Sequence, residues 1–350
     1  MKKLTLIMTL MLTSIAFAQE VESTPLEISG SGDLYYKYDF SGNQNIGTSF
    51  ADEQNSVSLG MIDIALKKKT GKASFVGEVS FGPRGAGQSI PNVDGQSFHI
   101  QNLYASYAFS DKFSMTAGYM ATFIGYEVIS PVGNFHYSTS YLFTNGPFQN
   151  AGIKASYAFS SKVSLMAGLF NDQWNLYKAS PSFGLNAFGA QLTVTPVEGW
   201  TAYINLLTGS ASGTIIDLTT AYQISPKFKL GLNVADFSGT IDETGFTGFA
   251  LYPSYAVSDK FSLGLRAENF NVKKAGSPFS IPTTDGFSKI VGDESVTAFT
   301  LSANIKSGGL TFIPEFRTDG ASANSFKSSG STTMDSKSAS QVTFAVVYGF

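Results

Sequence analysis

Apolar and polar residues alternate along most of this chain, in segments that are separated by polar turns. Alternation with a period of two is typical of a strand with one face in water and the other in apolar surroundings. A seven-residue pattern, Tyr-x-apolar-Ser-x-Lys-apolar, joins such segments four times, at 107–113, 157–163, 222–228 and 255–261. Its Ser-x-Lys centre is a tight polar turn. The repeated unit of strand, turn and strand predicts an up-and-down antiparallel sheet.

The alternation and the turns together predict about sixteen strands, with fourteen or eighteen as alternatives, each long enough to cross a membrane at a tilt. The predicted ranges are 26–40, 55–67, 73–82, 97–109, 113–124, 149–159, 163–172, 185–195, 200–208, 213–224, 228–237, 245–257, 261–272, 295–306, 310–318 and 338–350. Short turns alternate with longer loops, as in outer-membrane barrels, where the short turns face the periplasm. The predicted fold class is all-β, a transmembrane antiparallel up-and-down barrel with long extracellular loops.

The first predicted strand shows how the two faces differ. Leu34, Tyr36 and Tyr38 share one face, and Asp33 and Lys37 share the other. An apolar face beside a polar one predicts lipid outside the barrel and water inside it. Closure of the sheet also removes the strand edges that hydrocarbon cannot solvate.

The composition favours a membrane barrel over a soluble periplasmic β-protein, which is the remaining alternative fold. Hydrophobic residues make up 43% of the chain and aromatic residues 14%, but charged residues only 14%, whereas soluble domains carry about a quarter. The chain holds 23 Lys and Arg against 26 Asp and Glu, and no Cys. This charge argues against nucleic-acid partners, and the lack of Cys excludes disulfides and a lipid anchor.

Both ends of the chain carry export signals. Lys2 and Lys3 precede an apolar segment at 4–15 and a small-residue site at 16–18, so residues 1–18 are predicted to be a cleaved signal peptide. Residues 19–350 then form a single barrel domain. The last strand ends in Phe350 and places its large apolar residues on one face: Val342, Phe344, Val346, Tyr348 and Phe350. Such an ending resembles the signal that the barrel-assembly machinery of Gram-negative outer membranes reads.

The same alternation predicts which ionisable residues line the pore. Ten fall on inward positions: Asp33, Lys37, Glu78, Lys154, Asp172, Asp217, Arg266, Glu268, Glu315 and Arg317. Since both signs are present, no steep ion selectivity follows. About sixteen strands enclose an aqueous channel unless loops block it, which suits small hydrophilic solutes.

The segment 125–148 is predicted to be a loop that folds into the barrel and narrows it. Residues 137–143 alternate like a strand, but one extra crossing would put the Ser-x-Lys turns on either side at opposite rims. Folding inward would bring four residues of the loop near the lumen: Glu127, Asn134, His136 and Tyr137. The alternative is a loop packed on the outer rim.

The sequence carries no catalytic or cofactor signature. His99 and His136 are its only histidines, and neither has an evident partner for the base and orienting group that nucleophilic catalysis needs. Asp285, Asp293 and Glu294 could hold Ca²⁺, but solvated loop charges are the favoured interpretation. We expect no enzyme activity, no cofactor and no metal.

The stretch 118–172 resembles the OmpL-like putative β-barrel porin family. The matching pieces are 125–127, Asn134 with Tyr137 and Ser138, 147–148, the strand around Gly152 and, more loosely, 171–175. The resemblance implies porin-like passive transport, without a substrate or catalytic residues to carry over.

Two functions follow as hypotheses. The first is an outer-membrane channel for passive diffusion, and the alternative is a plugged barrel whose extracellular loops bind a partner. The sequence leaves open the identity of the solute, the ion selectivity, and the choice between a monomer and a homo-oligomer such as a trimer.

Overall fold

The computed structural model describes residues 23–84, 98–274 and 292–350. They form sixteen strands and two short helices: β1 (Glu27–Asp39), β2 (Val57–Thr70), β3 (Ala73–Phe81), β4 (Phe98–Ala108), β5 (Phe113–Ala121), η1 (Pro131–Gly133), α2 (Tyr141–Asn145), β6 (Gln149–Ala158), β7 (Val163–Phe170), β8 (Ala187–Val194), β9 (Trp200–Gly209), β10 (Gly213–Gln223), β11 (Phe228–Ser238), β12 (Gly245–Ser258), β13 (Phe261–Val272), β14 (Ser295–Ser307), β15 (Leu310–Ala321) and β16 (Ser338–Gly349). The predicted signal peptide and Asp285 lie outside the described residues.

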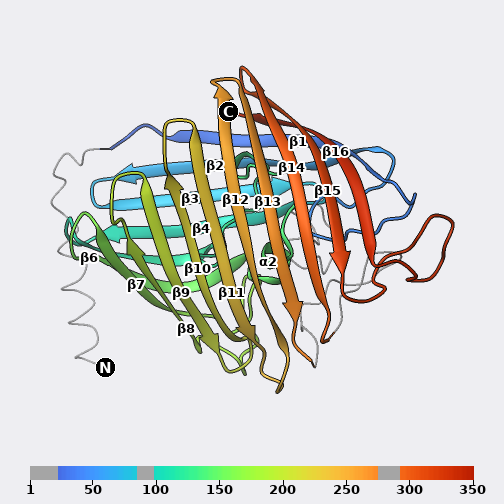
Figure 1. The fold of residues 1–350 in the computed structure, drawn as a ribbon. Coiled ribbons are helices and arrows are strands. Elements are labelled where there is room, and N and C mark those ends of the chain that lie inside the picture. The colour runs from blue at the N-terminus through green and yellow to red at the C-terminus, as the bar shows by residue number, and fades with distance from the viewer. Residues whose placement is uncertain (1–22, 85–97, 275–291) are drawn as a thin grey trace, which may run out of the picture.

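The strands close into one antiparallel barrel (Figure 1), as the sequence predicts. Each strand pairs with its neighbours in the chain, and β1 pairs with β16 from Ser31–Gly349 to Asp39–Gln341. Phe350 extends this last ladder, because its backbone N–H and C=O both bond to Gly30 at 3.0 Å. The C-terminal residue is therefore part of the closure. No helix among the described residues has the length and apolarity to cross a membrane.

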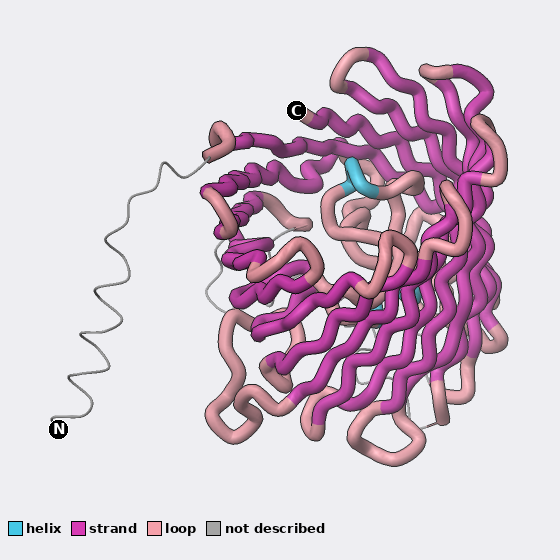
Figure 2. The backbone as a smooth tube through the Cα atoms, turned by 90° about the vertical axis from the view of Figure 1, so that its left-hand side faces the viewer, coloured by secondary structure: helices cyan, strands magenta, loops and turns pink. Residues whose placement is uncertain are grey.

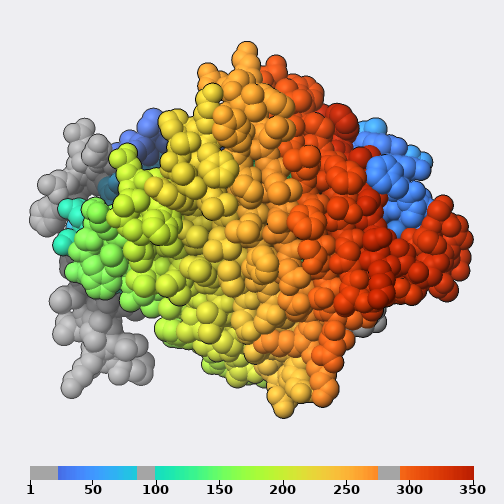
Figure 3. Space-filling view, viewed as in Figure 1, coloured from blue at the N-terminus to red at the C-terminus, as the bar shows by residue number. Residues whose placement is uncertain are grey.

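The two faces of β1 are divided as predicted. Leu34 and Tyr38 are 42% and 36% exposed, whereas Asp33 and Lys37 are 6% and 1% exposed. The outer wall formed by β9 to β16 is continuous in Figure 3. Because side chains alternate strictly across a strand, one face can meet lipid while the other meets the interior.

The four Ser-x-Lys turns are built alike. Each serine, at 110, 160, 225 and 258, accepts a hydrogen bond at its Oγ from a backbone N–H two or three residues later. A serine hydroxyl thereby satisfies a turn amide that the strand ladder leaves unpaired. These turns lie at the same end of the barrel as the start of β1 and the end of β16.

Two aromatic residues near the end of β5 do not face lipid. Tyr119 is on the outer face but only 6% exposed, because the ring of Tyr177 from the β7–β8 loop packs on it at 4.9 Å. Phe123 is within the predicted strand 113–124, but it lies beyond the end of β5 and packs against the inward-facing Phe170. The strand ends at Ala121 rather than at 124, so its alternation does not extend to Phe123.

The connection between β5 and β6, residues 122–148, lies inside the wall of strands. Both helical segments in Figure 2 belong to it and are surrounded by the barrel. Residues 137–143 do not form a strand, which agrees with the parity of the crossings.

The inner face is polar over only part of its height. Near the long loops, the inward residues of β7 and β11 to β14 are apolar and join loop side chains in one cluster, which includes Phe170, Trp174, Phe237, Phe246, Phe270 and Phe326. The predicted polar, water-facing inner face therefore does not extend to this end. The loops fold over these positions, so their neighbours are loop side chains and not water.

Candidate constriction inside the barrel

The loop 122–148 spans the interior from one wall to another. Its segment η1 lies against β16, and α2 lies against β12 and β13. Ser130, just before η1, has its Oγ 3.1 Å from that of Ser31 on β1. The backbone N–H of Gly125 donates to Asp217 of β10 at 3.1 Å, which fixes the start of the loop.

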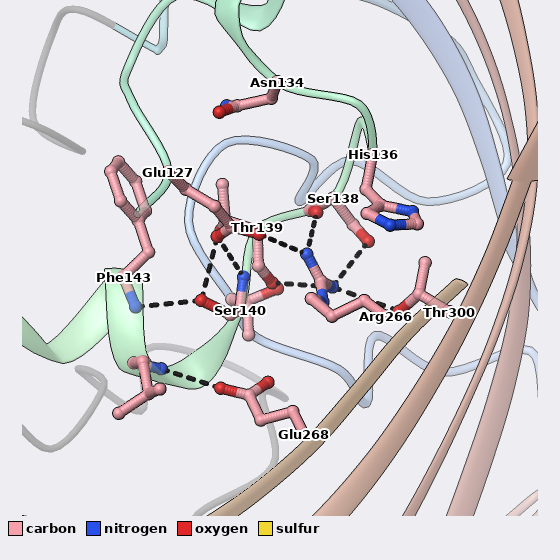
Figure 4. A network of polar contacts seen from close by, with 12 residues as sticks. Glu127, Asn134, His136, Ser138, Thr139, Ser140, Phe143, Arg266, Glu268 and Thr300 are labelled. Atoms are coloured by element: carbon pink, nitrogen blue, oxygen red, sulfur yellow. Dashed lines mark hydrogen bonds and ion pairs between the residues drawn. The ribbon is translucent and has the colours of Figure 1, made fainter. Parts of the chain in front are cut away.

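Arg266 of β13 is the main anchor of the loop (Figure 4). Its guanidinium is fully buried and forms an ion pair with Glu127 at 2.7 Å. It also donates to the backbone carbonyls of Ser138 at 2.6 Å and Thr139 at 3.2 Å, and to Thr300 at 3.1 Å. An arginine suits this position because its planar group presents five donors.

Two carboxylates of the wall hold the backbone of the loop. Glu315 of β15 accepts from the N–H groups of Tyr137 and Ser138, at 2.9 and 3.1 Å. Glu268 of β13 accepts from Tyr141 and Leu142, at 3.0 and 2.9 Å. The latter pair is the first turn of α2, where backbone donors have no partner within the helix.

Arg317 of β15 joins the loop to the β1–β2 connection. It binds Asp319 through two parallel contacts, at 2.8 and 2.9 Å. It also donates to the carbonyl of Thr139 at 2.8 Å and to Thr48 at 2.9 Å. Its guanidinium lies 5.2 Å from the ring centre of Tyr141, so two loops and the wall share one buried cation.

A second ion pair lies on the β1 side. Asp33 binds Arg84 at 3.2 Å and accepts from the hydroxyl of Tyr137 at 2.5 Å. The guanidinium of Arg84 also lies 4.9 Å from the ring centre of Tyr137. The ring of Tyr35 is 5.5 Å from that of Tyr137, so this group fills the space between β1 and the loop.

His136 lies between β14 and Arg266, and its Nδ1 is 2.8 Å from the Oγ of Ser302. Burial, together with the charge of Arg266, lowers the pKa of His136 well below its usual value, so the ring is neutral at pH 7. Neither His136 nor His99, whose Nε2 has no hydrogen-bond partner among the described residues, has the arrangement of a catalytic base.

The remaining predicted residues are spread around the barrel. The side-chain amide of Asn134 accepts from the backbone N–H of Val128 and donates to its carbonyl, which closes this part of the loop on itself. Glu78 accepts from Asn102, and Lys154 is half-buried on β6. Asp172 lies beyond the end of β7 and binds the β9–β10 turn at 210–212, so it is at the rim and not on the lumen wall.

Four buried polar atoms form a patch on β1 and β16 without hydrogen-bond partners among the described residues. They are Lys37 Nζ, Asp39 Oδ2, Gln341 Oε1 and Thr343 Oγ1. Lys37 lies opposite Thr343 in the ladder, and Asp39 opposite Gln341. These four atoms make the inner wall polar at this height of the barrel.

A cavity of about 840 Å³ opens at the short-turn end. The walls of this mouth come from β1, β2, β14 and β16, with Ser130 to Phe135 of the loop as its floor. Asp63, Glu78, Lys67, Lys229 and Lys306 give it charges of both signs. Within the described ranges, no three His, Cys, Asp or Glu side chains are grouped closely enough to hold a metal ion.

Three residues of this network were missed from the sequence. Asp63 is on an inward position of the predicted strand 55–67, so the alternation could have identified it. Asp319 lies one residue past the predicted end of its strand. Arg84 follows Gly82 and Pro83 beyond a strand end, where no alternation remains to indicate its direction.

Comparison with known proteins gives a family match over most of the chain. The sequence profile of the family described as putative beta-barrel porin-2, OmpL-like, matches residues 25–350. No curated protein matches the chain significantly.

Solved outer-membrane proteins share the fold at low identity. The trimer form of OmpT from Vibrio cholerae is 12% identical with a TM-score of 0.58, over 94% of this chain and 99% of that chain. OprB of Pseudomonas putida is 11% identical with a TM-score of 0.60, over 93% and 94%. A mutant porin of Rh. blastica is 16% identical with a TM-score of 0.50, over 93% and 100%. These likenesses establish the barrel fold alone.

Proposed function

Since the chain belongs to the putative beta-barrel porin-2, OmpL-like family, we propose that it is a non-enzymatic channel through which small hydrophilic solutes diffuse across the outer membrane. The barrel is wide enough for an aqueous path. The observation that carries the proposal is the two polar regions on the inner wall of β1 and β16, the mouth at Ser31 and the patch around Lys37. Between them lie the apolar side chains of Tyr35, Ala345 and Val347. Water and solutes would follow this wall, past the loop 122–148.

The narrowest point of that path would be the group of Asp33, Arg84 and Tyr137. All three side chains are buried and bonded to one another, so a solute can pass only if the loop shifts or the side chains rotate. The proposed channel is therefore narrow, and the loop is its constriction.

Single-channel recording of the purified protein in planar bilayers tests the function. We expect stable open steps in wild-type protein, because a shift of the loop or a rotation of these side chains would complete a wet path that conducts ions. A correctly folded barrel that stays silent at all voltages would rule out the channel.

The selectivity test uses the ion pairs at the constriction. Asp33→Asn and Glu127→Gln each leave a buried arginine without its counter-charge, so we expect the reversal potential in a salt gradient to shift toward anions. Glu198→Gln, in the exposed β8–β9 turn, serves as the control and should leave it unchanged.

A disulfide tests whether the loop must move. The chain has no Cys, so Ser31→Cys with Ser130→Cys would tie the loop to β1, where the two Oγ atoms are 3.1 Å apart. We expect the oxidised protein to conduct less than the reduced one. Ser106→Cys with Thr116→Cys, whose hydroxyls are 2.7 Å apart across β4 and β5, should cross-link within the wall without effect.

A second candidate function is the plugged barrel that binds partners through its loops. The apolar cluster near the long loops favours it, because close packing of Phe237, Phe246 and Phe326 leaves these side chains no contact with solvent. Conductance that is absent even in the reduced disulfide variant would support the plugged barrel.

The same proposal includes export and assembly. Residues 1–18 would be removed as a signal peptide, and the barrel-assembly machinery would recognise the terminal strand with Phe350 exposed on its outer face. Outer-membrane lipid would cover the apolar wall, and a homo-oligomer remains open to test by cross-linking.

A further inference from the structure

The repeated turn pattern places lysines in a ring around one mouth of the barrel. Four lysines lie in the Ser-x-Lys turns of the hairpins β4–β5, β6–β7, β10–β11 and β12–β13: Lys112, Lys162, Lys227 and Lys260. A fifth, Lys72, lies in the Gly-Lys turn of β2–β3, and all five are exposed. We call this set the lysine ring. The β8–β9 turn has Glu198 in this region, and the β14–β15 turn follows Lys306.

The barrel fixes the position of each lysine in the ring. The backbone carbonyl of every ring lysine accepts a hydrogen bond from the following hairpin, at 2.7 to 2.9 Å, from Ala108, Ala158, Thr195, Ala256 and Lys306 in turn. Each ring residue also directly precedes the first residue of a strand. The backbone of every ring lysine is therefore held at the rim by the same ladder that holds the sheet, and the flexible side chains extend from there.

The ring lysines are not engaged in short ion pairs, although Asp111 and Asp259 lie beside two of them in the same turns. Across the described ranges, no ring lysine forms an ion pair within the usual distance, and the only lysine of this rim that does is Lys67, with Glu27. Two ring ammonium groups reach a backbone carbonyl of the next hairpin, those of Lys72 and Lys162, each at 3.3 Å. Each ammonium has three donors, so all five remain available to an anion.

Aromatic side chains mark the height of the ring relative to the lipid. Tyr107 and Phe109 are 46% and 51% exposed on the outer wall with ring centres 4.9 Å apart. Tyr157 and Phe159 repeat this pair at 5.0 Å. Amphipathic aromatic rings occupy the headgroup level of a membrane. The lysines follow these rings by three to five residues in the turn, which places them at the level of the lipid phosphates.

We propose that the lysine ring binds the phosphates of anionic phospholipids in the periplasmic leaflet. Lysine is a compact donor that suits a phosphodiester, and attraction of a basic rim to anionic lipid has a measurable free energy for each lysine. The ring does not depend on the channel, since its side chains are outside the path described above.

The test compares lipid selectivity of two variants that lose the same charge. The first replaces all five ring lysines with Gln. The control replaces five lysines near the opposite rim: Lys178, Lys273, Lys274, Lys327 and Lys337. Each protein is reconstituted in phosphatidylcholine bilayers with a small fraction of spin-labelled phosphatidylglycerol, and the motionally restricted fraction gives the association constant relative to labelled phosphatidylcholine. Heat-modifiable migration confirms that each barrel is folded.

We expect wild type and control to prefer phosphatidylglycerol about fivefold at a lysine site, and the ring variant to show almost no preference. Raising the salt concentration should weaken the wild-type preference in the same way. An equal preference in wild type and ring variant would overturn the proposal. So would a wild type without preference that instead sediments with isolated peptidoglycan, because the ring would then bind the anionic cell wall.

Discussion

The walls on the two sides of the barrel use their inward positions differently. On β13 and β15 these positions carry Arg266, Glu268, Glu315 and Arg317, and every one of them binds the loop. On β6, β7 and β8, the only charged residue is Lys154. The loop backbone needs partners where it crosses the interior, and the charged wall provides them.

The opposite wall provides space instead. A Cβ atom on Gly189 of β8 would lie 2.7 Å from the rings of both Phe123 and Phe170. Glycine there lets two aromatic rings, Phe170 at the end of β7 and Phe123 just after β5, approach the sheet closely. The same alternating pattern therefore places charged side chains that anchor the loop on β13 and β15, and a glycine that leaves a recess for aromatic rings on β8.

The largest effect should come from the anchor. Arg266→Met leaves Glu127 buried without its cation and leaves the carbonyl of Ser138 without a donor. We expect a loss of about 3–5 kcal/mol in the free energy of unfolding, measured by urea titration in detergent micelles.

Lys154→Met is the matched control on the opposite wall, with an expected change below about 1 kcal/mol. If both variants lose the same stability, the charged wall has no special role in holding the loop.

A smaller effect is expected at the recess. Gly189→Ala forces the rings of Phe123 and Phe170 to move, which should cost about 1–3 kcal/mol by overpacking. Gly320→Ala is the control, because a Cβ at Gly320 meets nothing within 4 Å. Equal melting behaviour of the two variants would show that the recess is not tightly packed.

The strands were predictable because their signals are local. The predicted range 261–272 coincides with β13. The Ser-x-Lys turn marks where this strand begins, and the alternation of its side chains marks how far it extends. The inward direction of Arg266 follows from the same alternation.

The partners of these residues were not predictable, because they are far apart in the chain. Arg266 and Glu127 are 139 positions apart, and no periodic pattern connects a wall residue with a loop residue. Phe237 and Phe246 also resemble breaks in a polar face when the sequence is taken alone. Their place in a packed layer depends on Trp174 and Phe326 from other loops.

The smallest effect concerns pH and the neutral His136. Its pKa is well below the usual value of about 6.5 in the docked loop and would return toward that value if the loop were released. Below pH 6.5, the released loop binds a proton that the docked loop does not. Docking should therefore weaken by at most about 1.4 kcal/mol for each further pH unit.

The measurement is the urea midpoint between pH 7 and pH 5 for wild type, His136→Gln and the control His99→Gln. Asp52 opposes the effect, because burial raises its pKa to about 6 and its protonation then favours the folded state as the pH falls. All three proteins retain Asp52. The difference between His136→Gln and the other two proteins therefore isolates the effect of His136. We expect wild type and His99→Gln to lose more stability on acidification than His136→Gln. Parallel curves for all three would mean that His136 exchanges protons freely, and that the loop near Arg266 is open to water.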